Sequence, residues 1–474
     1  MDFNRVLENF ENFSKVPHGS GHMDEICDYC IAFAQRLHLE WHRDAGNNIV
    51  IKKPATIGRE KAPTVILQGH LDMVCDKTPD ASSDPERDGV KIIKNGDILS
   101  ADNTTLGADD GIAVAYALTI LESTDIEHPA LEVLLTTDEE IGMIGASKLD
   151  TSSLSGKTML NIDSAEEGCF TVACAGGVRA DFRFDASFAH HGTKTYKLTV
   201  SGLLGGHSGE EIDRGRSNAY KLLGETLYRL NRTFPVYLAS IGGGGKDNAI
   251  AKYAEAIFSL DEGHDAEIAS IISESERAAH RIYGESDPDI HIHVQSAAEL
   301  PLCIDRDRTT EILEVFQQMP NGVISYSHEF PGFVETSLNL GVVTTSDKGI
   351  ELTISLRSFK DSELDKLLAK LVNICEKYHG RYSTHGKYPA WPYVAHSHLR
   401  DIMVECYRKR FGEEAKVMPI HAGLECGLLT YMMPGLDCIS FGPNIYDLHT
   451  PRERMSISSA ERTWHLLLDT LKTI

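Results

Sequence analysis

The chain has 474 residues, far more than the roughly 100 to 200 residues of a typical single domain, so two domains are expected. Its 46 basic and 70 acidic residues give a formal net charge of −24, which repels nucleic acid phosphates and anionic membrane surfaces. This balance excludes nucleic acid and membranes as partners and favours a small neutral or zwitterionic molecule.

Targeting signals and cysteine content point to the cytoplasm. The first seven residues show no cationic start followed by an apolar run, so no secretory signal is expected. No apolar stretch approaches the length of a membrane span. The ten cysteines form no recognisable disulfide framework, which suits a reducing compartment.

Hydrophobic periodicity predicts an α/β domain at the start of the chain. Apolar residues recur at helical spacing in residues 3–13 and 23–34, so two amphipathic helices come first. Further elements are expected as a helix at 112–121 and strands at 49–51, 65–67, 131–135 and 159–162. This alternation is typical of a largely buried sheet with helices around it.

A second domain is expected as an insertion into the first. From about residue 179 the pattern changes to alternating strands, such as 196–200, separated by helices such as 219–230. Prolines break this α+β region near residues 388–392. The strand at 438–441 and the helix at 464–471 are expected to rejoin the first domain. The expected boundaries are residues 1–182 and 387–474 for the first domain and 183–386 for the second.

Polar side chains follow the predicted strands of the first domain, where α/β folds place their sites. The strand at 65–67 runs into Gly69-His70-Leu71-Asp72, and residues two apart on an extended chain share a face. An isolated His-x-Asp is more often a capped loop with a surface histidine. In a metal site, however, the carboxylate would orient the imidazole ligand.

Carboxylates occupy three further element ends. Asp109 and Asp110 open the helix at 112–121, although the helix dipole alone would favour acids there. The strand at 131–135 leads into Asp138-Glu139-Glu140, whose mutual repulsion is costly unless cations neutralise it. The strand at 159–162 ends in Asp163. Four such ends indicate a polynuclear metal site, and imidazole and carboxylate ligands without thiolate suit a hydrolytic Zn²⁺ or Mn²⁺ centre.

The order of these residues resembles that of the cocatalytic metallopeptidases, the family of aminoacylases, carboxypeptidase G, PepT-type tripeptidases and PepD-type dipeptidases. Its members show a His-x-Asp, an acid pair opening a helix, a Glu-Glu, an Asp or Glu, and a distant His. The matching residues here are His70, Asp72, Asp109, Glu139, Glu140, Asp163 and His449. The resemblance implies a zinc-exopeptidase-like catalytic domain, with a mixed sheet flanked by helices, interrupted by an inserted α+β lid domain.

Carried over residue by residue, the resemblance implies two divalent metal ions per chain. Zinc is expected, with Mn²⁺ and Co²⁺ as alternatives. Asp109 would bridge the ions, His70 and Asp163 would hold one, and Glu140 and His449 would hold the other. The peptide bond after the bridging aspartate would be cis. Cys27 and Cys30, by contrast, lie on the apolar face of a predicted helix and are not expected to bind metal.

The resemblance also implies catalytic roles. Glu139 would be the general base that moves a proton from water to the leaving amine, and Asp72 would orient His70. His207, in Gly205-Gly206-His207-Ser208-Gly209-Glu210, matches the lid histidine that stabilises the oxyanion in relatives. That stretch also resembles a serine nucleophile elbow, but Glu210 stands where the elbow requires its second glycine.

Finer features resemble the PepD-type, Xaa-His dipeptidases over essentially the whole chain. Dipeptidases of the family carry Asp at the position of Asp163, whereas deacylases tend to carry Glu, and residues 244–250 and 421–427 also match. By similarity, Asn248 and Arg357 would bind the substrate carboxylate, although a solvated charge at a strand end is the alternative for Arg357. A homodimer through the lid is left open, and His421 is kept out of the metal set because it could be structural.

The expected function is therefore metal-dependent hydrolysis of free dipeptides in the cytoplasm. Its nearest rival is an N-acyl amino acid amidohydrolase on the same scaffold, against which Asp163 argues. A catalytically silent metal-binding protein is a second rival, but it would have no use for Glu139. A dinucleotide-binding enzyme is the third, and the glycine run at 242–245 lacks the Gly-x-Gly-x-x-Gly setting that such an enzyme needs.

Overall fold

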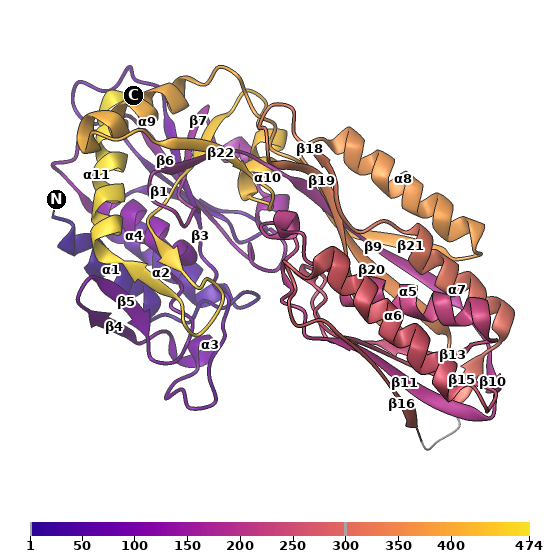
Figure 1. Cartoon of the computed structure of the whole chain (residues 1–474). Helices are drawn as coiled ribbons and strands as arrows, with labels where there is room; N and C mark the ends of the chain where they lie inside the picture. The colour runs from indigo at the N-terminus through magenta and orange to yellow at the C-terminus, as the bar shows by residue number, and fades with distance from the viewer. Residues whose placement is uncertain (1, 298–300) are drawn as a thin grey trace. The chain divides into compact units, whose positions relative to one another are not determined.

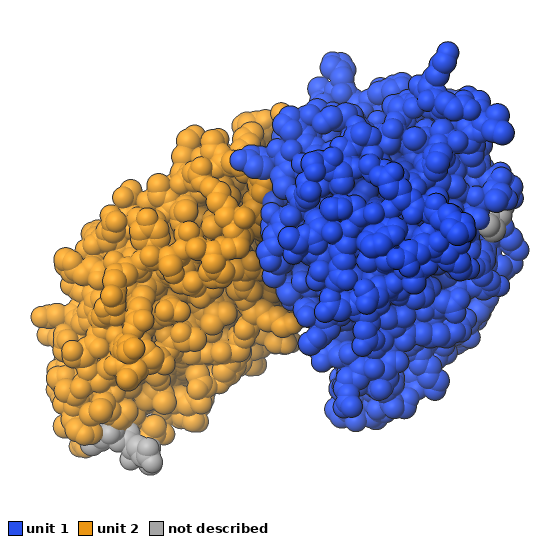
Figure 2. Space-filling model, turned by 180° about the vertical axis from the view of Figure 1, so that it is seen from behind, with its two compact units in different colours: residues 1–174, 391–419, 424–474 blue, residues 175–390, 420–423 orange. Residues whose placement is uncertain are grey.

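The structure, a computed structural model, describes residues 2–297 and 301–474 (Figure 1). It contains two compact units, coloured blue and orange in Figure 2. Unit 1 consists of Met1–Cys174, Trp391–Pro419 and Leu424–Ile474, and unit 2 of Ala175–Ala390 and Ile420–Gly423. Unit 2 is therefore inserted between segments of unit 1. Its first boundary precedes the expected one because β9 (Gly176–Asp185) pairs with strands of unit 2, so that a cut after residue 182 would divide β9.

An eight-stranded mixed sheet forms the centre of unit 1. Its four middle strands, β6, β3, β7 and β23, are parallel, and antiparallel pairs lie outside them. In spatial order the strands are β1 (Glu40–Arg43), β2 (Ile49–Lys53), β6 (Leu131–Thr136), β3 (Val65–His70), β7 (Thr158–Asn161), β23 (Asp437–Ser440), β8 (Cys169–Cys174) and β22 (Lys416–Ile420). Because β6, β3 and β7 are parallel, their carboxyl ends lie at one edge of the sheet, where an α/β fold places its site.

Helices flank this sheet, as expected (Figure 1). They are α1 (Asn4–Ser14), α2 (Asp24–Arg36), α3 (Pro85–Asp88), α4 (Ala108–Glu122), α9 (His398–Phe411), α10 (Glu425–Met432) and α11 (Ile457–Thr473). A small second sheet contains β24 (Ile445–Tyr446), β25 (Arg454–Ser456), β5 (Ile98–Ala101) and β4 (Ile92–Asn95). Helix α4 is apolar around its whole circumference and packs on both α1 and β3. Burial of each Ile or Leu on it stabilises the fold by about 1.5–3 kcal/mol, which fixes the helix start at the sheet edge.

Unit 2 is an antiparallel α+β structure. One sheet contains β18 (Gly322–Tyr326), β19 (Val334–Ser346), β20 (Gly349–Ser358), β9 and β21 (Arg381–Tyr388), and the other β13 (Tyr237–Gly242), β15 (Ala254–Leu260), β11 (Lys194–Ser201) and β16 (His291–Ala297). Two short ladders pair β12 (Gly206–His207) with β14 (Ala249–Ile250) and β10 (Phe188–His190) with β17 (Leu302–Ile304). The helices are α5 (Ala219–Thr233), α6 (Asp265–Tyr283), α7 (Arg306–Gln318) and α8 (Asp361–Lys377), and their apolar faces share one core with the sheets.

Most expected elements are confirmed, since the predicted helices and strands correspond to α1, α2, α4, α5 and α11 and to β2, β3, β6, β7, β11 and β23. All ten cysteines are free, as expected. Cys27 and Cys30 are buried in the apolar face of α2, and burial raises the pKa of the Cys27 thiol to about 12. Within residues 2–297 and 301–474, no helix has both the length and the apolar character that a membrane crossing requires.

Candidate active site

Asp109 lies between two histidines at the sheet edge of unit 1. Its Oδ1 is 3.1 Å from Nε2 of His70, the last residue of β3, and its Oδ2 is 3.2 Å from Nε2 of His449. His449 comes from the loop between β24 and β25 and adopts a φ of 60°, which non-glycine residues rarely do. One carboxylate that presents each oxygen to a different imidazole has the arrangement of a bridging ligand.

The other two expected ligands face the same imidazoles. Oε1 of Glu140 is 2.9 Å from Nε2 of His449, and Oδ1 of Asp163 is 4.0 Å from Nε2 of His70. Ligand atoms of His70, Asp109 and Glu140 all lie within 4.8 Å of one another. The structure therefore brings the five expected ligands into one cluster with two histidine-centred halves.

Asp110 adds a carboxylate that the sequence analysis did not assign. One of its oxygens also lies within 4.8 Å of ligand atoms of His70 and Asp163. However, Oδ2 of Asp110 accepts the backbone N–H of His70 at 3.2 Å, which makes Asp110 an anchor of the β3 end. A Cβ on Gly69 would lie 2.6 Å from that same oxygen, so glycine permits the contact. The peptide bond between Asp109 and Asp110 is cis, as the resemblance implied.

The donor set suits divalent cations. Among the described residues, none donates a hydrogen bond to the buried Oε1 of Glu140, although Nε2 of His449 is 2.9 Å away. Burial raises the pKa of Glu139 and of Asp163 well above their ordinary values, and neighbouring carboxylates add to the rise. Burial lowers the pKa of His449, but contacts with Asp109 and Glu140 outweigh it and raise that pKa to about 11. A cluster that holds protons so tightly has a strong local excess of negative charge, which bound divalent ions would neutralise.

Asp72 contacts more than the histidine that it was expected to orient. The Nδ1–H of His70 donates to the backbone carbonyl of Asp72 at 2.9 Å, whereas the Asp72 carboxylate is 3.5 Å from Nδ1. This hydrogen bond assigns the proton to Nδ1 and leaves the Nε2 lone pair for a metal. The carboxylate itself accepts the backbone N–H groups of Glu139 and Glu140 and the hydroxyl of Ser20. Asp72 thus joins the end of β3 to the loop that carries the predicted base.

A second buried carboxylate, which the sequence analysis missed, lies beneath this edge. Oε2 of Glu425 accepts hydrogen bonds from Gln68 and from Thr136, each at 2.6 Å. Gln68 in turn accepts from Asn161. Burial raises the pKa of Glu425 to about 7. Gln68 in β3 and Asn161 at the end of β7 stand two residues before His70 and Asp163. The alternation of side chains along an extended chain therefore places these partners on the same face as the ligands.

The expected lid residues lie in unit 2, in two groups. His207 pairs with Ala249 across the β12–β14 ladder, and the N–H of Ser208 donates to the carbonyl of Asn248 at 2.9 Å. In the second group, Nη1 of Arg357 donates to the Tyr388 hydroxyl at 2.9 Å.

Arg357 is only 8% exposed, so the alternative of a solvated strand-end charge is wrong. Nε of Arg357 is buried and has no hydrogen-bond partner in the part of the chain that the structure describes. Its cross-strand neighbour, Ser337, contacts Nε2 of His421 at 2.7 Å, and His421 therefore belongs to unit 2 and not to the metal cluster. Burial lowers the pKa of His421 to about 3, with further lowering by Arg357 and His207.

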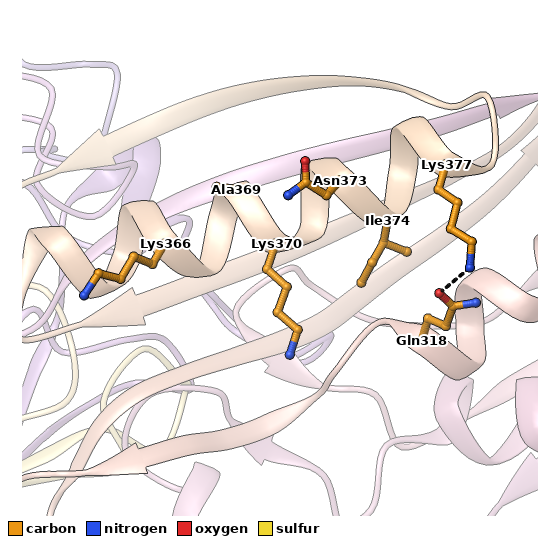
Figure 3. A pocket seen from close by; sticks show the side chains of 7 residues that line it. All are labelled: Gln318, Lys366, Ala369, Lys370, Asn373, Ile374 and Lys377. Carbon is orange, nitrogen blue, oxygen red and sulfur yellow. Dashed lines mark hydrogen bonds between the residues drawn. The ribbon is translucent and has the colours of Figure 1, made fainter.

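A pocket of about 640 Å³ lies elsewhere on unit 2, along α8 (Figure 3). Lys377 donates a hydrogen bond to Gln318 at one end of it (Figure 3). Its lining residues are Gln318, Lys366, Ala369, Lys370, Asn373, Ile374 and Lys377. Because this lining offers neither carboxylate nor imidazole, the pocket cannot serve as the hydrolytic centre.

The chain is similar to known peptidases over almost its whole length. The chain is 35% identical over 467 residues to the cytosol non-specific dipeptidase of Escherichia coli (strain K12), which covers 98% of this chain and 96% of that protein. The crystal structure of aminoacylhistidine dipeptidase from Vibrio alginolyticus superposes with a TM-score of 0.87 at 34% identity, covering 99% of this chain and 96% of that one. A tripeptidase from Staphylococcus aureus shares the fold, with a TM-score of 0.59 at 16% identity, covering 100% of this chain and 98% of the other. Residues 66–473 match the peptidase family M20/M25/M40, and the chain belongs to that family.

Proposed function

We propose that this chain is a metal-dependent dipeptidase that hydrolyses the peptide bond of free dipeptides, including Xaa-His dipeptides. The observation that carries the proposal is the position of Asp109 between His70 and His449, beside the loop of Glu139. The two dipeptidases described above, each similar over almost the whole chain, support the same substrate class. The N-acyl amino acid amidohydrolase is not favoured.

The proposed site holds two divalent ions, with zinc as the expected metal. Asp109, His70 and Asp163 would hold one ion, and Asp109, Glu140 and His449 would hold the other. The separation of the two imidazoles on opposite oxygens of Asp109 supports this division. Imidazole and carboxylate ligands are those that a hydrolytic zinc centre prefers. When bound, the ions supply Lewis-acid polarisation of the peptide carbonyl and favour deprotonation of a water molecule.

Glu139 is the proposed general base. Its carboxylate accepts a proton as a water oxygen attacks the peptide carbonyl carbon, and it returns that proton to the departing amine nitrogen. The C–N bond breaks as the proton reaches the amine nitrogen, so one water is consumed for each peptide bond. Asp72 supports this role because it holds the backbone N–H of Glu139. In unit 2, His207 is proposed to donate a hydrogen bond to the carbonyl oxygen as negative charge develops on it.

Recognition of the substrate carboxylate is proposed to rest on unit 2, acting as a lid. Arg357 is buried, and its Nε has no hydrogen-bond partner among the described residues, so a carboxylate ligand would satisfy this donor. Asn248 would supply an amide to the same carboxylate. We further propose that the protein works in the cytoplasm and forms a homodimer through unit 2, whose edge strand β21 is exposed along most of its length.

Parallel assays of free dipeptides and N-acyl amino acids test this function. The zinc-loaded protein is given Ala-His, other unblocked dipeptides and N-acetylated amino acids under the same conditions, and release of free amino acids is measured. We expect hydrolysis of the dipeptides at a kcat/KM at least a hundredfold above that for the acylated compounds. A higher kcat/KM for the acylated compounds would contradict the proposal and indicate a deacylase.

A further inference from the structure

We propose that Glu453 is a positioning residue of the metal centre, one that holds the bridging ligand Asp109 and ties it to the loop of His449. This inference rests on the proposed two-metal site. Glu453 itself points its carboxylate at backbone groups and does not contact the reacting atoms, so its effect passes through the ligands.

The carboxylate of Glu453 accepts four consecutive backbone N–H groups. Oε2 accepts from Leu106 at 2.9 Å and from Gly107 at 3.0 Å, and Oε1 accepts from Ala108 at 2.9 Å and from Asp109 at 3.4 Å. Glu453 is 1% exposed, so water does not compete for these donors. The last of the four N–H groups belongs to the bridging ligand itself.

These four N–H groups lie where a helix start leaves donors in need of an acceptor. Residues 106–109 lead into the first turn of α4, where a helix leaves its N–H groups without intrahelical partners. A negative charge there is also favoured by the helix dipole. Gly107, directly before α4, has a φ of 68°, and a Cβ on it would lie 2.7 Å from Sδ of Met73. This close packing leaves no room at residue 107 for a side chain that could cap the helix start. A carboxylate from a distant part of the chain provides the cap.

Glu453 also belongs to the loop that carries His449 of the second metal half. Its own N–H donates to the carbonyl of Thr450 at 3.0 Å, which closes a short turn directly after His449. The next three residues form β25, which pairs with β5 of the small sheet. Glu453 therefore connects the segment of Asp109 with the segment of His449, whose relative placement decides whether both oxygens of Asp109 can each reach a metal. Outer partners of this kind typically change metal affinity 10- to 100-fold when removed.

The test compares Glu453→Gln with a matched control, Glu132→Gln. Glu132 is also a buried carboxylate of unit 1, 3% exposed, and it accepts the backbone N–H groups of Ser155 and Gly156 at the far end of β6. Each amide substitution replaces one accepting oxygen with a donor. Both variants are therefore expected to lower the Tm of the metal-free protein.

Zinc affinity, measured by competition with a chromophoric chelator, separates the two roles. We expect Glu453→Gln to weaken binding of at least one ion tenfold or more and to lower kcat for Ala-His with KM changed less than threefold, while Glu132→Gln keeps wild-type values. Glu453→Asp, which retains the charge, should recover part of the zinc affinity.

Wild-type zinc affinity in Glu453→Gln would overturn the proposal and leave Glu453 as a helix cap. Failure of both Glu453 variants to fold, with Glu132→Gln folded, would also overturn it, because the residue would then serve folding. If the wild-type protein does not cleave Ala-His, the dipeptidase function fails, yet the affinity comparison still decides the role of Glu453.

Discussion

The backbone N–H of Glu139 donates to Oδ1 of Asp72 at 3.0 Å, although the two residues follow different strands, β6 and β3. The second oxygen of Asp72 holds the N–H of Glu140 and the hydroxyl of Ser20. One buried carboxylate thereby sets the backbone of both the proposed base and a proposed ligand. The side chain of Glu139 remains available for proton transfer because its main chain is held by other groups.

Asp72→Asn should therefore slow catalysis more than it weakens substrate binding. The amide would direct a donor at backbone N–H groups, and the repulsion would shift the loop of Glu139 and Glu140. We expect kcat for Ala-His to fall about 100-fold, with a smaller change in KM. Ser20→Ala removes only one of the three donors to Asp72 and serves as the control, with a fall of tenfold or less. An unchanged kcat in Asp72→Asn would show that the loop does not depend on this carboxylate.

Removal of the bridging carboxylate should abolish metal binding as well as activity. Asp109→Ala deletes both oxygens that face His70 and His449. Elemental analysis after zinc loading and dialysis should give two ions per wild-type chain and one or none in the variant. Asp102→Ala, which removes a half-buried aspartate that pairs with Lys91, is the control and should leave the metal content at two. Two tightly bound ions in Asp109→Ala would place the bridge elsewhere.

Unit 2 should lose stability in mild acid because of His421. Its pKa is about 3 in the folded protein, through burial and the nearby positive groups Arg357 and His207, against about 6.5 in an unfolded chain. Between these values the unfolded state binds one more proton, so the free energy of unfolding falls as pH falls below about 6.5. Between pH 6.5 and 5 this amounts to about 1.5 kcal/mol.

Urea unfolding of the metal-free protein at the two pH values measures that loss. His421→Gln lacks the titrating group, so its free energy of unfolding should change less than that of the wild type by about the same 1.5 kcal/mol. Equal pH dependence in the two proteins would mean that His421 takes up its proton in the folded state as readily as in the unfolded one.

We expect the enzyme to select for free dipeptides, because both ends of the substrate would be bound. In the proposed complex, Arg357 binds the free carboxylate of the dipeptide, and the half of the site that contains Asp163 lies toward its free amine. A longer or N-blocked chain would leave one of these charged groups unpaired, which costs roughly 1–3 kcal/mol or more. In a competition assay, Ala-His should therefore be cleaved at least tenfold faster than acetyl-Ala-His or a pentapeptide. Arg357→Ala should remove most of this preference, whereas Arg381→Ala, which removes an exposed charge on β21, should not. Comparable cleavage of the pentapeptide by the wild type would contradict this picture of recognition.

The elements that position the site could be predicted from local pattern because each signal lies within a few residues. Apolar runs ending at His70 and Asp163 identify strands and ligands together, since the residue after a buried strand reaches the sheet edge. The unit boundary could not be placed as well, because β8 ends at Cys174 and β9 begins at Gly176 with one residue between them. Two consecutive buried strands give no composition change where the chain passes from one unit to the other.

The supporting carboxylates could not be predicted because their partners are distant or are backbone atoms. Glu453 stands in the charged stretch Thr450-Pro451-Arg452-Glu453-Arg454, which reads as a solvated turn. Its four partners are N–H groups, which every non-proline residue carries and which no sequence pattern distinguishes. Glu425 likewise reaches Gln68 and Thr136 only after the last segment of the chain has returned to unit 1.

Hydrolysis of Ala-His by four preparations tests whether peptide hydrolysis depends on the metal and uses Glu139 as the base. The preparations are the zinc-loaded wild type, the metal-free wild type, the metal-free wild type after zinc is restored, and zinc-loaded Glu139→Gln with its metal content measured. We expect activity in the first and third, none in the second, and a kcat at least 10³-fold lower in Glu139→Gln despite two bound ions. A metal-free protein that still cleaves Ala-His would contradict metal dependence, and a zinc-loaded Glu139→Gln with near wild-type kcat would contradict the role of Glu139 as the base.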